Sequence, residues 1–270
     1  MSFLVNPYSY AGCDSDALAF LTATGITDAT ITSAICTLVK TMKADGTWSK
    51  CNAIYPMVGG TSTTCMYNLK SPLNANSSFR LSFVGGWSFS ANGALPNGVN
   101  SYADTFLAGN VNTQNSSHLS YYSRSNTAGG VGVFKVDMGY LKLTPTGINN
   151  VLILKRDNLS AGLINTATSL TSTTALTNTQ GFYLANRTTS ILNRLWKNGV
   201  VVNSSADVSV APSTISNYIG ARNSPDNLGV RNFTDRQCAF STIGSGLTDG
   251  EAAALYTSVQ AFQTTLSRQV

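Results

Sequence analysis

The sequence predicts a mainly β protein, a two-sheet antiparallel sandwich of jelly-roll type with a small N-terminal helical segment and a short C-terminal helix. Three observations carry this expectation. Short apolar runs with β spacing recur from Phe79 onward, and Gly-Gly or Asn-Gly pairs separate many of them. Helical periodicity is confined to the two ends of the chain. Ser, Thr and Asn make up about a third of the residues and replace charge, which is only 11%.

The N-terminal segment is predicted to be a pair of helices within residues 14–46. Acidic residues at Asp14 and Asp16 favour a helix start, Gly25 can close that helix, and Thr27 is expected to cap the next one. The second helix carries one apolar stripe (Ile31, Ile35, Leu38 and Met42) and is expected to end at Gly46. This pair is too small to hold a core alone. We therefore expect residues 1–60 to pack on the sandwich or on a neighbouring subunit, and residues 61–270 to form the sandwich.

The strands are predicted from alternation and turn signals, after a transitional stretch over 47–78 that is anchored by a turn at Trp48 to Pro56. The predicted strands are Phe79–Val84, Trp87–Ser90, Asp104–Ala108, Leu119–Arg124, Val131–Asp137, Gly139–Thr144, Asn150–Lys155, Gly181–Asn186, Ile191–Trp196, Val200–Asn203, Tyr218–Arg222 and Cys238–Ile243. The Thr- and Ser-rich interval Ala167–Gln180 indicates a longer loop or a weak edge strand.

The clearest hairpin surrounds Lys197-Asn-Gly199, because Asn-Gly accepts the two positive φ angles of a type I′ turn. The chain closes with a helix predicted over 248–266. Thr248 and Glu251 have the spacing of a capping box, and an apolar stripe follows (Leu255, Val259, Phe262 and Leu266).

Charge and cysteine content limit the partners and the compartment. The net charge of +5 is spread along the chain, which argues against nucleic-acid binding, and no apolar run reaches the length of a membrane span. The first residues lack the pattern of a secretory signal. The five cysteines are an odd number without C-x-x-C spacing, so reduced, buried thiols are expected, with Cys36 as a small hydrophobic residue on a helix.

Catalytic residue types are scarce. Glu251 is the single glutamate and is assigned to a helix cap, so the carboxylate pair of a glycosidase is not expected. His118 is the single histidine, which excludes a multi-histidine metal site. A calcium site from Asn223 and Asp226 is conceivable, but an ordinary Pro-Asp turn is the better account of these residues. We expect no enzymatic activity, no cofactor and no metal.

The candidate binding residues lie along the strand from His118 to Arg124. Alternation places His118, Ser120, Tyr122 and Arg124 on one face, and an aromatic ring beside hydrogen-bonding groups suits a saccharide. A solvated sheet face or a subunit contact is the alternative. His118, Tyr122 and Arg124 are therefore candidate carbohydrate-binding residues.

Two stretches resemble known families. The hairpin Leu195-Trp-Lys-Asn-Gly, the strands Tyr218-Ile-Gly-Ala-Arg and Cys238-Ala-Phe-Ser-Thr-Ile-Gly, and the helix start Leu247-Thr-Asp-Gly-Glu together resemble the concanavalin A-like (laminin G/pentraxin-type) jelly roll. The N-terminal residues Phe20-Leu-Thr-Ala-Thr-Gly-Ile-Thr-Asp, Ala53-Ile-Tyr-Pro-Met-Val-Gly-Gly-Thr and Asn68-Leu-Lys resemble bacteriophage virion proteins that carry such a domain. The lectins' acidic calcium ligands are not matched.

These resemblances imply a non-enzymatic structural component of a phage particle, as a capsid decoration, head fibre or tail appendage. It would be made in the bacterial host cytoplasm and reside on the virion. Expected partners are other virion proteins, further copies of the chain and a host surface glycan. The alternative function is a carbohydrate-binding module for host-receptor adhesion.

Overall fold

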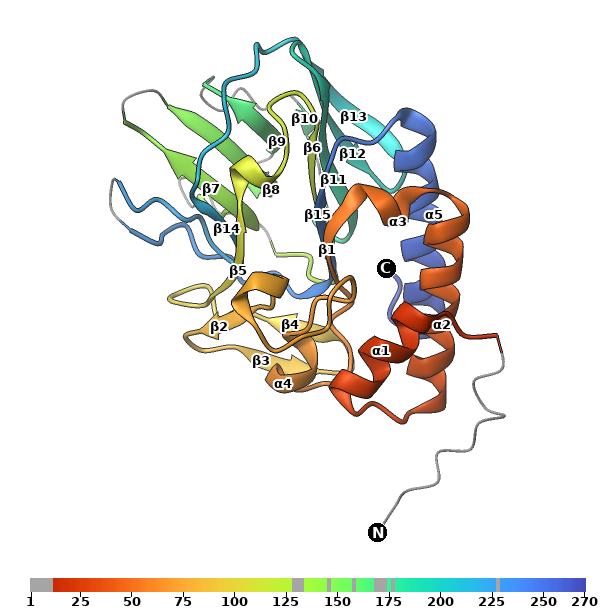
Figure 1. The fold of residues 1–270 in the computed structure, drawn as a ribbon. Coiled ribbons are helices and arrows are strands. Elements are labelled where there is room, and N and C mark those ends of the chain that lie inside the picture. The colour runs from red at the N-terminus through yellow and green to blue at the C-terminus, as the bar shows by residue number, and fades with distance from the viewer. Residues whose placement is uncertain are drawn as a thin grey trace.

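The computed structural model describes residues 12–127, 134–144, 147–156, 159–167, 174–175, 178–226 and 229–270. Two antiparallel sheets lie face to face, and helices cover the outer face of one of them (Figure 1). We call the helix-covered sheet the first sheet and the other the second sheet. This arrangement confirms the predicted fold class, a two-sheet sandwich with helices near the two ends of the chain.

The first sheet has the strand order β13-β12-β11-β6-β15-β4-β3, and β1 pairs with β15 beside this path. Its strands are β1 (Cys51–Tyr55), β3 (Ser88–Ser90), β4 (Gly93–Leu95), β6 (Ser117–Ser123), β11 (Gly181–Thr189), β12 (Leu192–Lys197), β13 (Val200–Ser205) and β15 (Cys238–Gly244). The turn between β12 and β13 is the predicted type I′ turn, because Asn198 and Gly199 have φ angles of 49° and 77°.

The second sheet has the strand order β10-β9-β8-β7-β14-β5-β2. Its strands are β2 (Ser82–Val84), β5 (Tyr102–Ala108), β7 (Met138–Lys142), β8 (Ile148–Arg156), β9 (Leu159–Thr166), β10 (Thr174–Ala175) and β14 (Ser216–Ile219). The short edge strand β10 falls in the interval predicted as a loop or weak edge strand. The predicted strand Val131–Asp137 is not formed over 134–137, and 131–133 lie outside the described residues.

The helices are α1 (Ser15–Thr24), α2 (Ala29–Ala44), α3 (Thr47–Lys50), α4 (Ser62–Cys65) and α5 (Asp249–Thr265), with 3-10 turns η2 (Asn76–Ser78) and η3 (Gly109–Val111). The predicted cap of α2 was wrong by one residue. Asp28 is the N-cap, and its carboxylate accepts the Ile31 N–H at 2.8 Å. The capping box of Thr248 and Glu251 at the start of α5 is confirmed.

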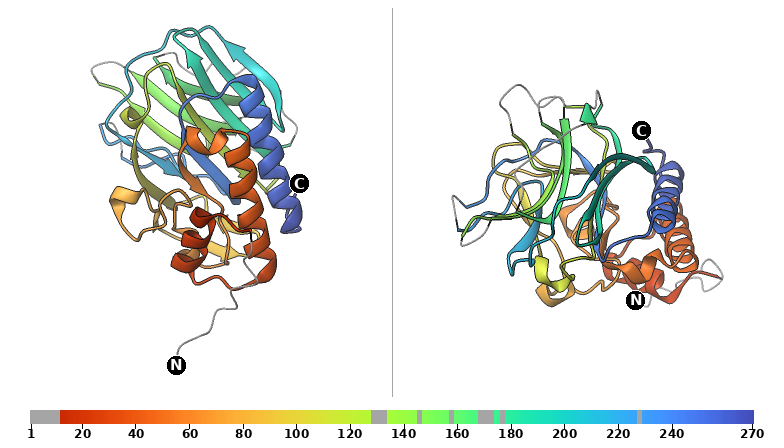
Figure 2. Two further views of the ribbon diagram at one scale, coloured as in Figure 1. Left: turned by 45° about the vertical axis from the view of Figure 1, so that its right-hand side comes forward. Right: turned by 90° about the horizontal axis from the view of Figure 1, so that it is seen from above.

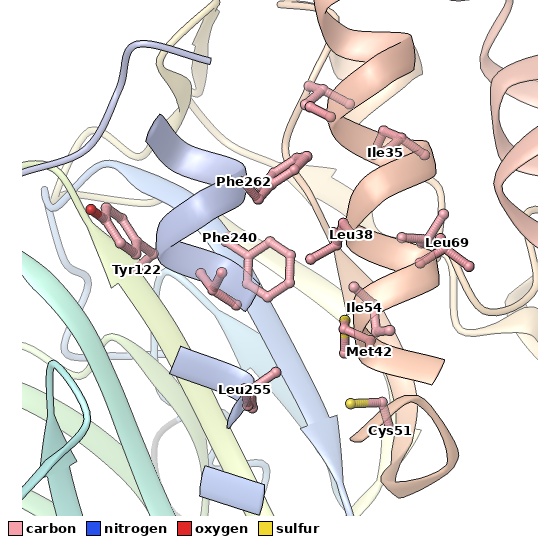
Figure 3. Close-up of a cluster of buried hydrophobic side chains, with 14 of the residues drawn as sticks. Ile35, Leu38, Met42, Cys51, Ile54, Leu69, Tyr122, Phe240, Leu255 and Phe262 are labelled. Carbon is pink, nitrogen blue, oxygen red and sulfur yellow. The ribbon is translucent and has the colours of Figure 1, made fainter. Parts of the chain in front are cut away.

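Two buried apolar layers hold the fold together. One fills the space between the sheets, and the other joins the first sheet to α1, α2 and α5. Figure 2 shows the two sheets and the helices that cover the first sheet from two further sides. In Figure 3, Leu38 of α2 points toward Phe240 of β15, and Phe262 of α5 extends toward α2, with its ring 5.9 Å from that of Phe240. All three side chains are at most 2% exposed. The apolar stripe of α2 therefore packs against the sandwich of the same chain.

The strand β1 was not predicted. Residues 51–55 were expected to be part of a turn-rich transition, but they pair with β15 across some 190 positions of sequence. The boundary expected at residue 60 therefore falls after a strand of the first sheet. The longest strand that the sequence did not predict is β9, which pairs with β8.

The expectation of reduced cysteines was wrong for two of the five. Cys13 and Cys36 form a disulfide that ties the chain before α1 to the middle of α2. The other three, Cys51, Cys65 and Cys238, are free and buried as expected. Among the described residues, no helix is both long enough and apolar enough to cross a membrane.

Candidate functional site

His118 lies in β6 on the face that the helices cover, and it is fully buried. Its Nδ1 lies 2.6 Å from the Ser245 carbonyl oxygen, so Nδ1 carries the proton and donates it. Nε2 then accepts from the Thr242 hydroxyl at 2.9 Å. Burial lowers the pKa of His118 to about 4, although the bond to Ser245 opposes this shift. The imidazole is therefore neutral at pH 7 and serves as an internal hydrogen-bonding link.

Tyr122 is also fully buried, beneath α5. Its hydroxyl donates to Gln260 Oε1 at 3.1 Å and accepts the Val270 N–H at 3.0 Å. Arg124 is half-buried at the end of the same strand, where its backbone N–H donates to the Gln237 carbonyl. The carbohydrate site predicted from His118, Tyr122 and Arg124 is not formed in this structure, because the C-terminal helix occupies that strand face.

The outer face of the second sheet carries a different aromatic group. The rings of Tyr102 (β5) and Tyr218 (β14) stack with their centroids 4.8 Å apart and their planes 14° apart, and both side chains are half-exposed. Tyr218 lies directly opposite Asp104. The neighbouring residues Ala103 and Ile219 face the buried layer between the sheets, so alternation places the two tyrosines and Asp104 outside. We call Tyr102, Asp104 and Tyr218 the tyrosine patch.

The carboxylate of the tyrosine patch is held against its aromatic neighbours. Burial raises the pKa of Asp104, and hydrogen bonds from the Phe106 backbone and Tyr218 oppose this shift. Burial and then the Asp104 charge raise the pKa of Tyr218 to about 12. Asp104 Oδ1 accepts the Phe106 N–H at 2.7 Å. Asp104 is therefore a fixed hydrogen-bond acceptor beside an aromatic surface.

Backbone strain occurs at the edge of this patch. Phe106 has a φ angle of 53°, which is rare for a bulky side chain and costs free energy. In this conformation the Phe106 N–H donates to Asp104 Oδ1, and the Phe106 ring lies 5.8 Å from the guanidinium of Arg80. Strain of this kind is often retained where it positions functional groups.

A cavity of about 220 Å³ adjoins the tyrosine patch, since Ser82 in its wall lies opposite Asp104 in the sheet. Its walls come from α4, β2 and the residues between them (Ser62, Thr63, Met66, Arg80, Leu81, Ser82 and Phe83). A second cavity of about 320 Å³ lies in the helix layer, between the start of α2, the Val58-Gly-Gly loop and Leu266. We favour the first as part of a binding site, because hydroxyl and guanidinium groups line it beside the half-exposed tyrosine rings.

In the loop considered for calcium, the side chains of Asn223 and Asp226 make other hydrogen bonds. Asp226 Oδ2 already accepts hydrogen bonds from the Leu143 and Thr144 N–H groups and from the Thr144 hydroxyl. The Asn223 amide donates to the Ser216 carbonyl. In the part of the chain that the structure describes, no three His, Cys, Asp or Glu side chains cluster as metal ligands would.

Sequence reasoning missed the tyrosine patch. Tyr102 and Asp104 alternate with apolar residues in one strand, which marks an outward face, but the partner Tyr218 is more than a hundred residues away. Only the pairing of β5 with β14 brings the two rings together, and no local signal in the sequence specifies that pairing.

No protein-family model and no curated protein sequence matches this chain. Solved structures do match. A mutant of Trypanosoma rangeli sialidase with trans-sialidase activity is 13% identical, with a TM-score of 0.53, over 86% of this chain and 39% of that one. The same sialidase in complex with sialic acid is 14% identical, with a TM-score of 0.50, over 82% and 38%.

The receptor-binding domain of a botulinum neurotoxin C/D mosaic serotype is 9% identical, with a TM-score of 0.50, over 78% of this chain and 51% of that one. The chain thus spans about two fifths to one half of these matched chains. At such low identity the likeness shows the fold alone, a two-sheet antiparallel β-sandwich.

Proposed function

We propose that this chain is a non-enzymatic carbohydrate-binding module and that its ligand contacts the tyrosine patch. The observation that carries the proposal is a stacked, half-exposed tyrosine pair beside a fixed carboxylate, on the side of the sandwich away from α2 and α5. Aromatic faces pack against the C–H surfaces of sugar rings, and a carboxylate accepts hydrogen bonds from their hydroxyls. The adjoining cavity offers further hydroxyl groups and Arg80.

The matched structures are consistent with this proposal. The matched sialidase was solved with sialic acid, and the matched toxin domain is named for receptor binding. A lectin-like sandwich is compatible with such a role, but the residues of the tyrosine patch are the basis for it here.

The proposal that the module is not an enzyme is supported by where its acid and base groups lie. Glu251 Oε2 accepts the Thr248 N–H at 2.7 Å in the cap of α5. His118 is buried and bonded on both ring nitrogens. Neither group is placed beside the tyrosine patch, where Asp104 is the carboxylate. Among the described residues that form the tyrosine patch and the walls of its cavity, Asp104 is the one carboxylate, and one carboxylate does not supply the pair that glycoside hydrolysis ordinarily needs.

The test is a glycan array, followed by titration calorimetry with the best ligand. We expect Tyr218→Ala to weaken binding by about tenfold or more, since it removes one ring of the platform. Tyr218→Phe should retain most of the affinity because it keeps the ring. Tyr256→Ala is the matched control, a half-exposed tyrosine on α5. An array without any bound glycan would refute the proposal.

We further propose that the module is displayed on a bacteriophage particle, together with other virion proteins and further copies of itself. The low charge content favours this, because few ionic groups need desolvation at subunit contacts. Many copies would make weak single-site binding effective. Particle proteomics and the mass and symmetry of the purified protein test it. A strict monomer that is absent from particles would overturn it.

A further inference from the structure

Two arginines lie directly opposite each other just after β14. Arg222 and Arg231 form an antiparallel bridge in which Arg222 N–H donates to the Arg231 carbonyl at 2.9 Å and Arg231 N–H donates to the Arg222 carbonyl at 3.1 Å. Side chains of such a directly opposed pair leave the backbone on the same side. Like charges in these positions repel and destabilise the pairing. The bridge therefore has an electrostatic cost in the absence of an anion.

Arg222 is enclosed, yet no carboxylate of a described residue compensates its charge. The residue is only 9% exposed, and its guanidinium lies 5.5 Å from the centre of the Phe134 ring. Its Nε is buried without a hydrogen-bond partner, and no carboxylate among the described residues forms an ion pair with it. Burial, and then the charge of Arg231, lower the pKa of Arg222 to about 10.

The guanidinium groups of the other buried arginines make hydrogen bonds or ion pairs within the protein. Arg236 donates to both oxygens of Asp137 and to the Lys155 carbonyl. Arg187 and Arg268 each donate to several backbone carbonyls. Compensation is what makes a buried cation tolerable. Arg187 and Arg236 also keep one guanidinium nitrogen each without a partner. Arg222 differs from them because its guanidinium makes no hydrogen bond or ion pair with any described residue, and an oxyanion with two oxygens fits its planar fork.

The arginine pair lies on the same side of the molecule as the tyrosine patch. Phe134, beneath Arg222, packs against Val136, Val151 and Ile153. Val151 and Ile153 alternate along β8 with Leu152 and Leu154, which face the layer between the sheets, so this apolar group is on the outer face of the second sheet. Tyr218 is four residues before Arg222, a separation of at most about 14 Å along the chain. Figure 1 shows β14 on the side away from α2 and α5.

We propose that Arg222 and Arg231 together bind the carboxylate or sulfate group of an acidic saccharide. The anion site stands on the arginine geometry, and the saccharide that carries the anion rests on the proposed function. The acidic group would remove the repulsion between the two guanidinium groups, while a neighbouring sugar ring contacts the tyrosine patch. The ligand class is thereby narrowed from carbohydrates in general to acidic ones.

The first experiment tests the anion site alone. Sodium sulfate is titrated into ¹⁵N-labelled protein at constant ionic strength, and the arginine Nε–H signals are followed by NMR. We expect saturable shifts of the Arg222 signal that are absent in Arg231→Gln. In thermal melts, sulfate should raise the melting temperature of the wild type more than that of the Arg222→Gln variant. Lys40→Gln, which removes one exposed charge from α2, is the control. Equal stabilisation by sulfate of the wild type, Arg222→Gln and Lys40→Gln would overturn the proposed anion site.

The second experiment tests the saccharide. Acidic glycans, their neutral counterparts and an oligonucleotide of equal charge are compared on the same proteins. We expect binding of acidic glycans to weaken at least about tenfold in Arg222→Gln and to recover only partly in Arg222→Lys, which keeps the charge but loses the fork.

The outcomes separate this inference from the function on which it partly rests. Glycan binding that needs Tyr218 but is unchanged in Arg222→Gln keeps the proposed function and overturns the acidic-ligand inference. Saturable sulfate binding at Arg222 without any glycan binding keeps the anion site and overturns the carbohydrate function. Equal, Arg222-dependent binding of the oligonucleotide would overturn the assignment to saccharides.

Discussion

At the scale of single residues, His118 illustrates how this chain uses a polar group inside its core. The imidazole continues a chain of hydrogen bonds through Thr242 to Ser120, whose hydroxyl groups lie 2.6 Å apart. Each of the three is fully buried, so each bond replaces one that water supplies in the unfolded state. A group that looks functional in the sequence is therefore a structural one in the fold.

The buried imidazole predicts a specific pH dependence of stability. The unfolded histidine takes up a proton below about pH 6.5, whereas burial lowers the folded pKa to about 4. Between these values the unfolded state binds more protons, so the free energy of unfolding falls as the pH falls. The stabilisation is complete above pH 6.5, and its loss reaches about 3 kcal/mol near pH 4.

Urea unfolding at several pH values between 4 and 7.5 measures this effect. The variant His118→Asn retains a donor toward Ser245 but does not titrate. It should be less stable at pH 7 and show a shallower dependence on pH than the wild type. Parallel pH profiles for the two proteins would contradict the assignment, since the remaining carboxylates are common to both.

At the scale of elements, the helix layer depends on a covalent link as well as on packing. The Cys13–Cys36 disulfide closes a loop with a sequence separation of 23, which contains α1 and the first half of α2. A cross-link of this span is worth about 3 kcal/mol in the chain-entropy model. We expect Cys13→Ser/Cys36→Ser to lower the urea midpoint and dithiothreitol to lower it in the wild type but not in the variant.

Thiol labelling provides the second readout. Burial raises the pKa of Cys51 to about 12 and that of Cys65 to about 11, and Cys238 is also buried with a raised pKa. These three thiols should stay unreactive in the folded protein, so mild reduction should expose two reactive thiols. Two reactive thiols before reduction would show that the disulfide is not formed.

The elements also show which parts of the fold are readable from sequence. The Asn198-Gly199 turn, the Thr248–Glu251 capping box and the stripe of α2 depend on residues within a few positions of one another, and all three were predicted. The pairing of β1 with β15 and the stacking of Tyr102 on Tyr218 depend on partners far apart in sequence. Alternation also showed that His118 and Tyr122 share a face, but it could not show that α5 covers that face.

At the scale of the whole molecule, the helices and the sandwich share one apolar layer. Leu38 of α2, Leu255 of α5 and Phe240 of β15 belong to the same buried cluster, and Tyr122 and Trp196 of the first sheet join it. A helical segment with few buried contacts to the sandwich would unfold independently of it. In this protein, loss of the helix layer would expose the apolar outer face of the first sheet, so we expect the helix layer and the sandwich to unfold together.

The substitution Leu38→Ala tests this cooperativity. Leu38 is 2% exposed, and a buried Leu→Ala change costs about 2–5 kcal/mol through lost burial and the cavity that remains. Hydrogen exchange measured by mass spectrometry across a urea series should show α2 and β8 losing protection in one transition, at a lower midpoint than in the wild type. Ser33→Ala, at an exposed position of α2, is the control and should leave the midpoint nearly unchanged.

Loss of protection in α2 at a urea concentration where β8 remains protected would mean that residues 1–60 behave as a separate segment. That outcome would favour a helical segment able to exchange its contacts for those of a neighbouring subunit.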